Sequence, residues 1–258
     1  MTKKTVVITG STRGIGNGMA MQFLKRGHQV VINGRNSEGV ESMVRKLKDK
    51  GFDVSGEAGD IFNPETHKRL TDNAVSTFGK IDIWINNAGI PQTNILFHEL
   101  TDDEIEKLVS ANVTGMMYGS KAALNFFKEQ GYGKLFNMEG FGSDGRIMKK
   151  LSLYGTSKRA VNYFTKAVSK EVDEKTIQIG ALNPGMVRTD FIKDSMHTGS
   201  KEEQAKTKRV FDILGEDVVT VTEFLVNKIL KSQKQYDKIN YLTLPRFLPK
   251  LIKLIFVN

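Results

Sequence analysis

The sequence contains no cysteine among its 258 residues. This absence excludes disulfide bridges, iron–sulfur clusters and thiolate zinc sites, and it fits a reducing compartment. Histidine is scarce as well: the four His residues are scattered along the chain without the spacing of metal ligands. We therefore expect no metal site.

Long hydrophobic runs are also missing. No apolar run approaches the ~20 residues needed to span a bilayer. The apolar run after MTKK is too short for a signal peptide and leads directly into a glycine-rich turn. We therefore expect a cytoplasmic protein. The length of 258 residues, without a Pro/Ser-rich linker or an internal repeat, predicts a single domain over residues 1–258.

The charge balance is basic, with 38 Lys and Arg against 29 Asp and Glu, which gives a net charge of +9. Such a surface favours anionic partners, including a phosphorylated cofactor. The basic residues are spread along the chain, and no basic–aromatic cluster indicates a nucleic-acid module. We expect no nucleic-acid partner, and a solvated basic surface explains most of this charge.

Short β-branched runs alternate with amphipathic segments along the chain. Strands are expected at residues 4–9, 28–33, 52–58, 81–86, 133–138, 176–183 and 238–244. Helices are expected at residues 14–26, 38–50, 64–78, 102–130 with a break near Ala111, 153–173 and 216–232. The alternation predicts an α/β fold, a doubly wound parallel sheet of about seven strands with helices on both faces.

Two segments lie outside this alternation. Residues 190–214 are polar and charged, and we interpret them as a lid that holds one or two helices. Residues 245–258 form a basic and apolar tail. This tail either covers a pocket, lies in a subunit interface or, as the less favoured alternative, forms a helix on a membrane surface.

The segment TGSTRGIG (9–16) follows the first strand and opens the first helix, which is the context of a dinucleotide-binding turn. Gly10 allows a tight turn, and Gly14 and Gly16 let the backbone and the helix approach a pyrophosphate. The helix N-terminus offers its free N–H groups to the same group. The alternative is a turn with a purely structural role. The cofactor assignment also includes the other turn residues Ser11, Thr12, Arg13 and Ile15.

The end of the second strand indicates which nicotinamide cofactor is bound. NAD selection uses an acidic residue there, but this strand ends in Asn33-Gly34-Arg35. Arg13 lies in the nearby glycine turn, and two guanidinium groups suit a 2′-phosphate. The sequence therefore predicts NADPH/NADP+. The alternative is that Arg35 is a solvent-facing residue that caps the next helix.

Two further segments are predicted to contact the adenosine half of the cofactor. Asp60 and Ile61 follow the third strand and are placed to touch the adenine edge. NNAG (86–89) ends the fourth strand with small and amide residues, whose backbone can pass close to the ribose. Asn86 can alternatively act as a cap at the end of the strand. The residues of this segment that we assign to the cofactor are Asn87, Ala88 and Gly89.

Tyr154 and Lys158 are four residues apart and so share one face of the expected helix. An ammonium group favours the phenolate and is expected to lower the pKa of the phenol from its usual value near ~10. Tyr154 can then donate a proton to a carbonyl oxygen as hydride arrives. Lys158 can also bond the nicotinamide ribose. Alone, such a pair is common on ordinary helices.

The motifs TGSTRGIG, NNAG, Asn112, YGTSK and NPGMVRT occur in this order and together resemble the short-chain dehydrogenase/reductase family over nearly the whole chain. The resemblance implies a Rossmann-type domain, carbonyl/alcohol hydride transfer, and a homo-dimer or homo-tetramer formed through residues 111–130 and 153–173. It further implies Tyr154 as proton donor, Lys158 as partner of the phenol and the ribose, and Asn112 as holder of a relay water. It also implies a turn beside the nicotinamide carboxamide formed by Pro184, Gly185, Val187 and Thr189.

The loop before Tyr154 departs from the usual family pattern. Most members have two serines at the end of this strand, and the second polarises the substrate carbonyl. Here the place reads Met138-Glu139-Gly140, and the loop is one residue longer. Ser143, 11 positions before Tyr154, is the substitute that we predict. The alternative is a loop serine that bonds its own backbone.

A narrower resemblance supports Ser143. FNMEGFGSDGR, YGTSKR, NPGMVRTD and YLTLPR are similar to the chlorophyll(ide) b reductase branch, whose members carry a comparable loop. That branch reduces a formyl group on a tetrapyrrole with NADPH, and it has relatives in organisms without chlorophyll. The similarity therefore favours the Ser143 assignment more than a chlorophyll substrate.

The function predicted from the sequence is NADPH-dependent reduction of a small-molecule ketone or aldehyde. One alternative is a non-catalytic NADPH-binding sensor or scaffold, which the intact Tyr154, Lys158 and Asn112 disfavour. The other is the same reductase attached to a membrane surface by its C-terminal helix. The candidate walls of the substrate pocket are Phe141, Met148, Met186, Phe191 and Met196.

Overall fold

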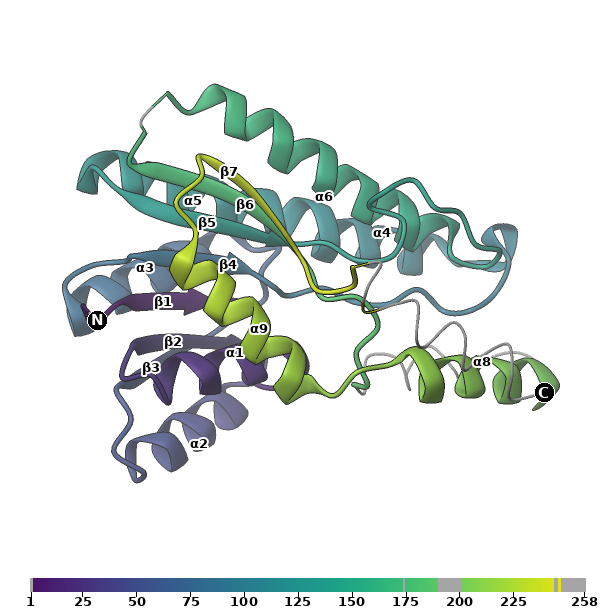
Figure 1. The fold of residues 1–258 in the computed structure, drawn as a ribbon, viewed down its shortest axis with the longest axis horizontal. Coiled ribbons are helices and arrows are strands. Elements are labelled where there is room, and N and C mark those ends of the chain that lie inside the picture. The colour runs from purple at the N-terminus through teal and green to yellow at the C-terminus, as the bar shows by residue number, and fades with distance from the viewer. Residues whose placement is uncertain (1, 174, 190–200, 244–245, 247–258) are drawn as a thin grey trace.

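The computed structural model describes residues 2–173, 175–189, 201–243 and 246, and their centre is one seven-stranded sheet (Figure 1). The strand order is β3-β2-β1-β4-β5-β6-β7, and every neighbouring pair is parallel. This confirms the predicted doubly wound fold. The strands are β1 (Thr5–Ile8), β2 (Gln29–Gly34), β3 (Val54–Ala58), β4 (Ile83–Asn86), β5 (Gly133–Met138), β6 (Ile177–Asn183) and β7 (Tyr236–Asn240).

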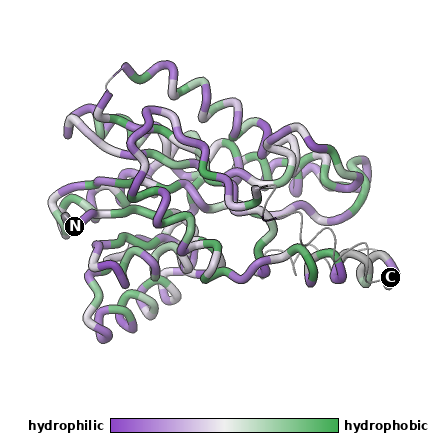
Figure 2. The backbone as a smooth tube through the Cα atoms, viewed as in Figure 1, coloured by the Kyte–Doolittle hydropathy of each residue, from purple (hydrophilic) through white to green (hydrophobic). Residues whose placement is uncertain are grey.

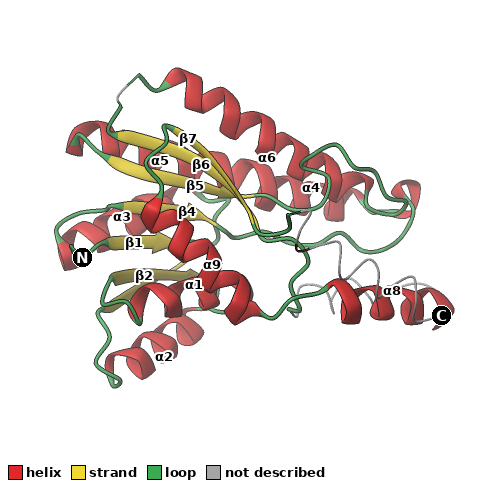
Figure 3. Ribbon diagram, viewed as in Figure 1, coloured by secondary structure: helices red, strands yellow, loops and turns green. Residues whose placement is uncertain are grey.

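Helices cover both faces of the sheet, as Figure 3 shows. Helices α1 (Gly14–Leu24), α2 (Ser37–Lys48) and α9 (Val218–Lys231) pack on one face. Helices α3 (Pro64–Phe78), α5 (Gly115–Gln130) and α6 (Ser152–Glu171) pack on the other. Along the helices the hydropathy alternates between apolar and polar residues (Figure 2), because each helix buries one stripe against the sheet and exposes the other.

The two apolar layers use alternate side chains of the same strands. Ile8 and Ile32 belong to the layer under α1, α2 and α9, whereas Val7 and Val31 belong to the layer under α3, α5 and α6. This follows from the period of two along a strand. Trp84, which is fully buried, lies in the second layer. A strand buried on both sides must be apolar throughout, which is why the β-branched runs in the sequence located the central strands.

The predicted helix starts are confirmed by their capping bonds. Asn63 precedes α3 and accepts a hydrogen bond from the backbone N–H of Glu65 at 3.0 Å, with Pro64 as the first helical residue. Thr101 and Glu104 form a capping box at the start of α4 (Asp102–Val109). A short 3₁₀ turn (Phe97–Glu99) precedes α4.

The predicted break near Ala111 is a π-helical turn (Ser110–Thr114) between α4 and α5. A π turn inserts one extra residue into a helix and often marks a functional position. Asn112 lies in this turn, and its side chain is buried. The irregularity in the sequence pattern therefore coincides with a residue that the family resemblance assigns to catalysis.

The last strand differs from the prediction. β7 ends at Asn240 rather than at residue 244. The side chain of Tyr241, directly after the strand, packs edge-on against Phe224 of α9 with ring centres 5.4 Å apart. The guanidinium of Arg246 lies over both rings, at 4.2 Å from the centre of Phe224 and 4.5 Å from that of Tyr241. The Tyr241 side chain of the apolar run YLTL therefore packs beyond the end of the strand.

The predicted lid contains helix α8 (Lys201–Leu214), which lies beyond the carboxyl ends of the strands in Figure 1. Residues 190–200, including Phe191 and Met196, and the tail 245–258 apart from Arg246 lie outside the described residues. Within the described ranges, no helix combines the length and the apolar character needed to cross a bilayer.

A buried polar network joins strands β4 and β5 to the helices beneath the carboxyl edge. Asn86 accepts a hydrogen bond from Trp84 Nε1 at 2.8 Å and donates to Ser120 Oγ at 3.1 Å and Asn137 Oδ1 at 2.9 Å. Asn137 in turn donates to Thr165 Oγ1 at 3.0 Å. Asn86 is therefore the centre of a structural network that ties β4, β5, α5 and α6 together, and its role exceeds that of a cap.

We expect Asn86→Ala to lower the free energy of unfolding by about 3 kcal/mol, because it leaves several buried partners without a hydrogen bond. Asn63→Ala is the control, since it removes an exposed helix cap, and we expect a loss of about 1 kcal/mol. Urea denaturation monitored by circular dichroism measures both losses. Equal losses would contradict the central role of Asn86.

Candidate cofactor and catalytic site

The predicted motifs gather at the carboxyl edge of the sheet, where open α/β sheets bind their ligands. The turns after β1 and β4 touch: a β-carbon built on Gly10 would lie 2.8 Å from Ala88 Cα. The turn after β6 also comes near, since a β-carbon on Gly14 would lie 3.8 Å from Thr189 Cγ2. Residues far apart in the sequence thus form one surface at this edge.

The glycine turn has the shape that its sequence predicts. Gly10 and Gly14 have φ angles of 60° and 57°, in the left-handed region that favours glycine. A β-carbon on Gly16 would overlap the carbonyl oxygen of Gly10 and the side-chain amide of Asn87. Helix α1 begins at Gly14, so its N-terminus lies at the turn and can bind a diphosphate there.

Ser11 and Asn33, both predicted to bind the cofactor, are fully buried and hold the turn in shape. Ser11 Oγ donates to the carbonyl of Ile8 at 2.7 Å and accepts from the N–H of Asn33 at 2.9 Å. Asn33 Oδ1 accepts from the N–H of Gly10 at 3.1 Å, while Nδ2 donates to the carbonyl of Glu57 at 3.1 Å. The side chains of Ser11 and Asn33 therefore stabilise the conformation of the glycine turn through hydrogen bonds to the backbone.

Arg13 and Arg35 are both exposed at the end of the glycine turn and of β2. Helix α2 is capped by Asn36, whose Oδ1 accepts from the N–H of Gly39 at 2.7 Å. Arg35 therefore does not cap this helix, whereas its side chain does face solvent, as the alternative also stated. Gly34 brings the end of β2 close to the glycine turn, because a β-carbon there would lie 2.6 Å from Thr12 Cγ2.

The NNAG segment is fastened to the glycine turn. Asn87 Nδ2 donates to the carbonyls of Thr9 and Gly10, each at 3.0 Å. The hydroxyl of Thr9 accepts from the N–H groups of Asn87 and Ala88 at 3.0 and 3.1 Å. These hydrogen bonds thus connect three of the predicted cofactor residues, Gly10, Asn87 and Ala88, to Thr9 at the end of β1.

Asp60 and Ile61 occupy the turn between β3 and α3. The Asp60 carboxylate accepts from the N–H of Phe62 at 3.5 Å, and its carbonyl accepts from the N–H of Asn63. Ile61 is buried against Gly115, where a β-carbon would lie 2.9 Å from Ile61 Cδ1. The Ile61 side chain therefore packs between α3 and α5.

Helix α6 carries Tyr154 and Lys158 on the face that meets the end of β5. Lys158 is 5% exposed, and its Nζ donates to the carbonyl of Met138 at 3.1 Å. The same nitrogen lies 5.7 Å from the centre of the Tyr154 ring. The phenol oxygen faces Gly140, because a β-carbon there would lie 2.6 Å from it. The structure therefore brings together the two residues of the predicted proton-transfer pair.

Burial controls the charge states of this pair. It lowers the pKa of Lys158 to about 8, a shift that the negative charge of Glu139 opposes. It raises the pKa of Tyr154 above the ordinary phenol value. The expectation that Lys158 lowers the pKa of Tyr154 is therefore wrong for the protein alone, because removing the phenolate from water dominates. At neutral pH Tyr154 is a protonated donor and Lys158 carries its charge.

Gln92 binds the first turn of α6. It is a site residue that was not predicted from the sequence. Its side chain is 2% exposed, and its Oε1 accepts from the backbone N–H of Tyr154 at 2.9 Å. A single glutamine in a loop gives no pattern, so no sequence signal identifies this contact. It fixes the position of Tyr154 relative to the segment that follows NNAG.

Asn112 connects the π-helical turn to both sides of the site. Its Oδ1 accepts from the N–H of Ile90 at 2.8 Å, and its Nδ2 donates to the carbonyl of Ile90 at 3.0 Å and to Ser157 Oγ at 3.2 Å. A β-carbon on Gly89 would lie 2.9 Å from Asn112 Oδ1 and 3.7 Å from Lys158 Nζ. The side chain of Asn112 is used in these bonds, and its role in holding a water stays a prediction.

Ser143 is fully buried, and its hydroxyl donates to Glu139 Oε2 at 3.1 Å. Its carbonyl accepts from the guanidinium of Arg159 at 3.0 Å. A serine hydroxyl has one proton to donate. Polarisation of a carbonyl by Ser143 therefore requires rotation of the hydroxyl away from Glu139, and this role stays a prediction.

Glu139 stands where most of the family has a serine, and it organises this corner of the site. The residue is 2% exposed, and its carboxylate accepts from Asn162 Nδ2 at 2.6 Å and pairs with Lys238 Nζ at 2.8 Å. The neighbouring Asp144 instead accepts from the N–H of Arg146 at 3.1 Å and pairs with its guanidinium at 2.7 Å. Of the two acids in the loop, Glu139 belongs to the site and Asp144 shapes the loop.

The remaining turn residues follow β6. Gly185 has a φ angle of 70°, and its N–H donates to Asn183 Oδ1 at 3.1 Å. Val187 forms an isolated bridge with Glu216. Pro184 lies between Asn183 and Gly185 and directly follows the carboxyl end of β6, as predicted.

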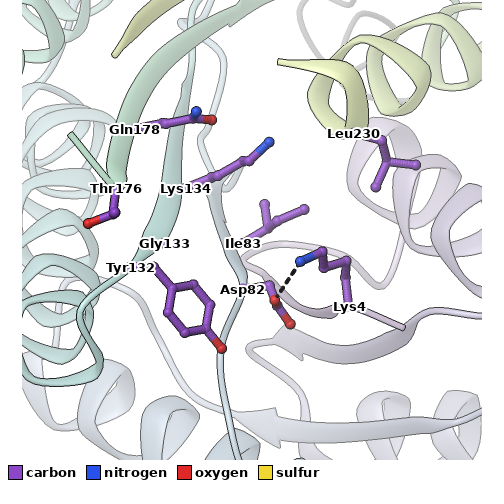
Figure 4. Close-up of a pocket in the computed structure, with 9 residues that line it drawn as sticks. All are labelled: Lys4, Asp82, Ile83, Tyr132, Gly133, Lys134, Thr176, Gln178 and Leu230. Carbon is purple, nitrogen blue, oxygen red and sulfur yellow. Dashed lines mark hydrogen bonds and ion pairs between the residues drawn. The ribbon is translucent and has the colours of Figure 1, made fainter. Parts of the chain in front are cut away.

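A cavity of ≈ 100 Å³ lies at the opposite edge of the sheet, at the amino ends of β4, β5 and β6 (Figure 4). Its lining includes Lys4, Asp82, Lys134 and Gln178. Asp82 is 4% exposed and pairs with Lys4 Nζ and Lys80 Nζ, each at 3.0 Å. No predicted site residue lines this cavity, and its ion pairs join strand ends.

The profile of the short chain dehydrogenase family matches residues 4–199. The chain is 36% identical over 230 residues to the protein named chlorophyll(ide) b reductase NOL, chloroplastic, of Arabidopsis thaliana. The matched region covers 87% of this chain and 64% of that protein. The chain spans 52% to 64% of the length of the curated Arabidopsis relatives that it matches. The resemblance to this branch is thereby confirmed.

Two solved structures with bound cofactors have the same fold. One is the actinorhodin polyketide ketoreductase with NADPH, with a TM-score of 0.80, 26% identity and coverage of 93% of this chain and 95% of that one. The other is the 3-ketoacyl-(acyl-carrier-protein) reductase from Brucella melitensis complexed with NADH, with a TM-score of 0.80, 26% identity and coverage of 92% and 96%. Similar folds thus carry either form of the nicotinamide cofactor.

We expect Gly16→Ala to weaken dinucleotide binding by about 10- to 100-fold, because the added methyl group overlaps Gly10 and displaces the turn at a cost of about 1–3 kcal/mol. Gly27→Ala is the control, because a β-carbon at Gly27 would meet no atom within 4 Å. Since Gly27 has a φ angle of 76°, we expect the substitution to lower the stability of the protein and to leave dinucleotide binding unchanged. Fluorescence titration with NADPH measures the affinities. Wild-type affinity in Gly16→Ala would contradict the close approach.

Proposed function

This chain belongs to the short-chain dehydrogenase family, and from that premise we propose that it is an NADPH-dependent reductase that converts a ketone or aldehyde into an alcohol. The observation that carries the proposal is the pairing of Tyr154 with Lys158 at the end of β5, beside a glycine turn shaped for a dinucleotide. A protonated phenol beside a buried ammonium suits proton donation to a carbonyl oxygen.

The residues divide the work of the reaction. Bound NADPH would supply the hydride to the carbonyl carbon. Tyr154 donates its proton to the carbonyl oxygen. Burial raises the pKa of the phenol, so the phenol is protonated at neutral pH and the transfer depends on stabilisation of the phenolate that forms. Lys158 lies 5.7 Å from the ring centre and stabilises the phenolate that forms when the proton leaves. Gln92 and Asn112 keep helix α6 and the segment after NNAG in register.

Ser143 is the second donor in this proposal. When its hydroxyl rotates from Glu139 to the substrate, the oxygen is held by both Ser143 and Tyr154. Gly140 leaves space beside the phenol oxygen, because it has no side chain there. The resemblance to the branch that carries a similar loop supports this assignment.

The choice of NADPH rests on the two exposed arginines. Arg13 lies in the glycine turn and Arg35 directly follows β2, and both side chains are exposed. Residues 33–37 include no carboxylate that would select the free ribose hydroxyl. Guanidinium groups bind phosphate oxygens in bidentate geometry. Because the solved relatives bind NADPH or NADH, this local chemistry carries the specificity argument.

The substrate class that we propose is a small-molecule carbonyl compound. One relative is a chlorophyll(ide) b reductase of Arabidopsis thaliana, and this chain matches 64% of its length. A cytoplasmic location and a homo-dimer or homo-tetramer built through residues 111–130 and 153–173 also stay predictions. A panel of aldehydes and ketones that includes diacetyl and benzaldehyde, followed by the nicotinamide absorbance, tests the activity itself.

We expect Tyr154→Phe to lower kcat/KM by about 10²- to 10⁴-fold, because it removes the proton donor. NADPH affinity should stay within about twofold of the wild type, since the ring and Lys158 remain. Steady-state kinetics and fluorescence titration measure the two quantities. Turnover at the wild-type rate would show that Tyr154 is not the donor.

We expect Arg35→Ala to weaken NADPH binding by about 10-fold or more, because a charge-assisted bond to the 2′-phosphate contributes about 1.5–3 kcal/mol. NADH affinity should not change. Arg45→Ala, at an exposed arginine in the last turn of α2, is the matched control for loss of one positive charge. Equal effects of the two substitutions on NADPH binding would refute the assignment of Arg35.

A further inference from the structure

Glu139 is a buried acid whose four acceptor positions are largely occupied. Asn162, Ser143 and Lys238 all donate to its carboxylate, at 2.6, 3.1 and 2.8 Å. These partners come from α6, from the loop after β5 and from β7. Burial of a carboxylate is costly unless it is paired and hydrogen-bonded, so these three partners compensate the loss of hydration and fix the side chain in place.

The residues on either side of Glu139 contact the catalytic pair. The carbonyl of Met138 accepts from Lys158 Nζ at 3.1 Å. On the other side, a β-carbon on Gly140 would lie 2.6 Å from the Tyr154 hydroxyl and 3.3 Å from Lys158 Cε. The backbone on both sides of Glu139 therefore contacts the side chains of Lys158 and Tyr154.

The charged groups around this corner come from two elements. Lys158 and Arg159 belong to α6, and Lys238 belongs to β7, next to Tyr236 across the same corner. Among the residues that the structure describes, Glu139 is the acid whose charge acts on Lys158, where it opposes the effect of burial on the pKa. Burial raises the pKa of Tyr236, and the charge of Glu139 acts in the same direction.

We propose that Glu139 is a positioning residue of the reaction, which supplies the negative charge that holds the Lys158 ammonium beside Tyr154. This inference rests on the proposed reductase function. It assigns a task to the acid that replaces the usual serine, and it links the last strand to the site through Lys238. Glu139 itself acts through Lys158.

The sign of the effect follows from the charges. Burial lowers the pKa of Lys158 to about 8, and the carboxylate of Glu139 works against that shift. Removing the carboxylate charge lowers the pKa of Lys158 further. Lys158 then loses its proton at a lower pH, and turnover that needs the ammonium declines at a lower pH. A residue with a purely structural role would lower turnover equally at every pH.

The test compares pH profiles of NADPH turnover with diacetyl and benzaldehyde as substrates. Glu139→Gln keeps the shape and removes the charge, and we expect its alkaline limb to move to lower pH, with turnover at pH 8 reduced about tenfold. Glu139→Asp keeps the charge, and we expect its alkaline limb to stay in place while turnover falls at all pH values. An unmoved limb in Glu139→Gln would overturn the inference.

Asp82→Asn is the matched control, because it also removes a buried carboxylate paired with lysines, but at the amino edge of the sheet (Figure 4). We expect it to lower stability without moving the pH profile. A limb that moves equally in Asp82→Asn would show a general loss of stability and would also overturn the inference. Circular dichroism confirms that each variant is folded.

A second measurement separates this inference from the proposed function. NADPH binding, followed by fluorescence as a function of pH, needs no turnover and reports Lys158 through its predicted bond to the ribose. If the wild-type protein turns over no compound of the carbonyl panel, the proposed reductase function is rejected. In that case the pH dependence of NADPH affinity, compared between the wild type and Glu139→Gln, still decides the role of Glu139. If Glu139→Gln does not fold, Glu139→Asp decides, and an unchanged turnover in that variant would overturn the inference.

Discussion

The site depends on one buried cation. Lys158 is 5% exposed, so its ammonium loses most of its hydration and must be balanced by oxygen atoms of the protein. The carbonyl of Met138 and the charge of Glu139 provide this balance at the end of β5. This contact holds the first turns of helix α6 against the end of β5, and Tyr154 lies one turn before the lysine on the same helix.

Much of the fold was predictable because its central strands are buried on both faces. Such strands must be apolar along their whole length, and runs such as KTVVIT therefore stand out. Capping signals at Asn63 and Thr101 located helix starts through side-chain chemistry alone. The end of β7 was missed, because an apolar run does not reveal at which residue the strand stops and the packing of side chains on α9 continues.

The site was predictable to the extent that local motifs determine it. Backbone conformation at Gly10 and Gly14, and the spacing of Tyr154 and Lys158, are properties of short segments. The contacts of Ser143, Glu139 and Gln92 depend on segments up to 99 positions away, such as the one that holds Lys238. The direction of the Tyr154 pKa was also missed, because desolvation is set by the packed protein and cannot be estimated from a neighbour in sequence.

Gly140 limits how this loop can evolve. A β-carbon at this position would lie 2.6 Å from the phenol oxygen, closer than such atoms approach in proteins. A single change that restores a hydroxyl-bearing residue here would push against Tyr154, whose helix is anchored by Lys158 at its next turn. A side chain at position 140 and the present place of the phenol oxygen therefore exclude each other, and the hydroxyl that most of the family carries on this strand end has no room here unless Tyr154 moves.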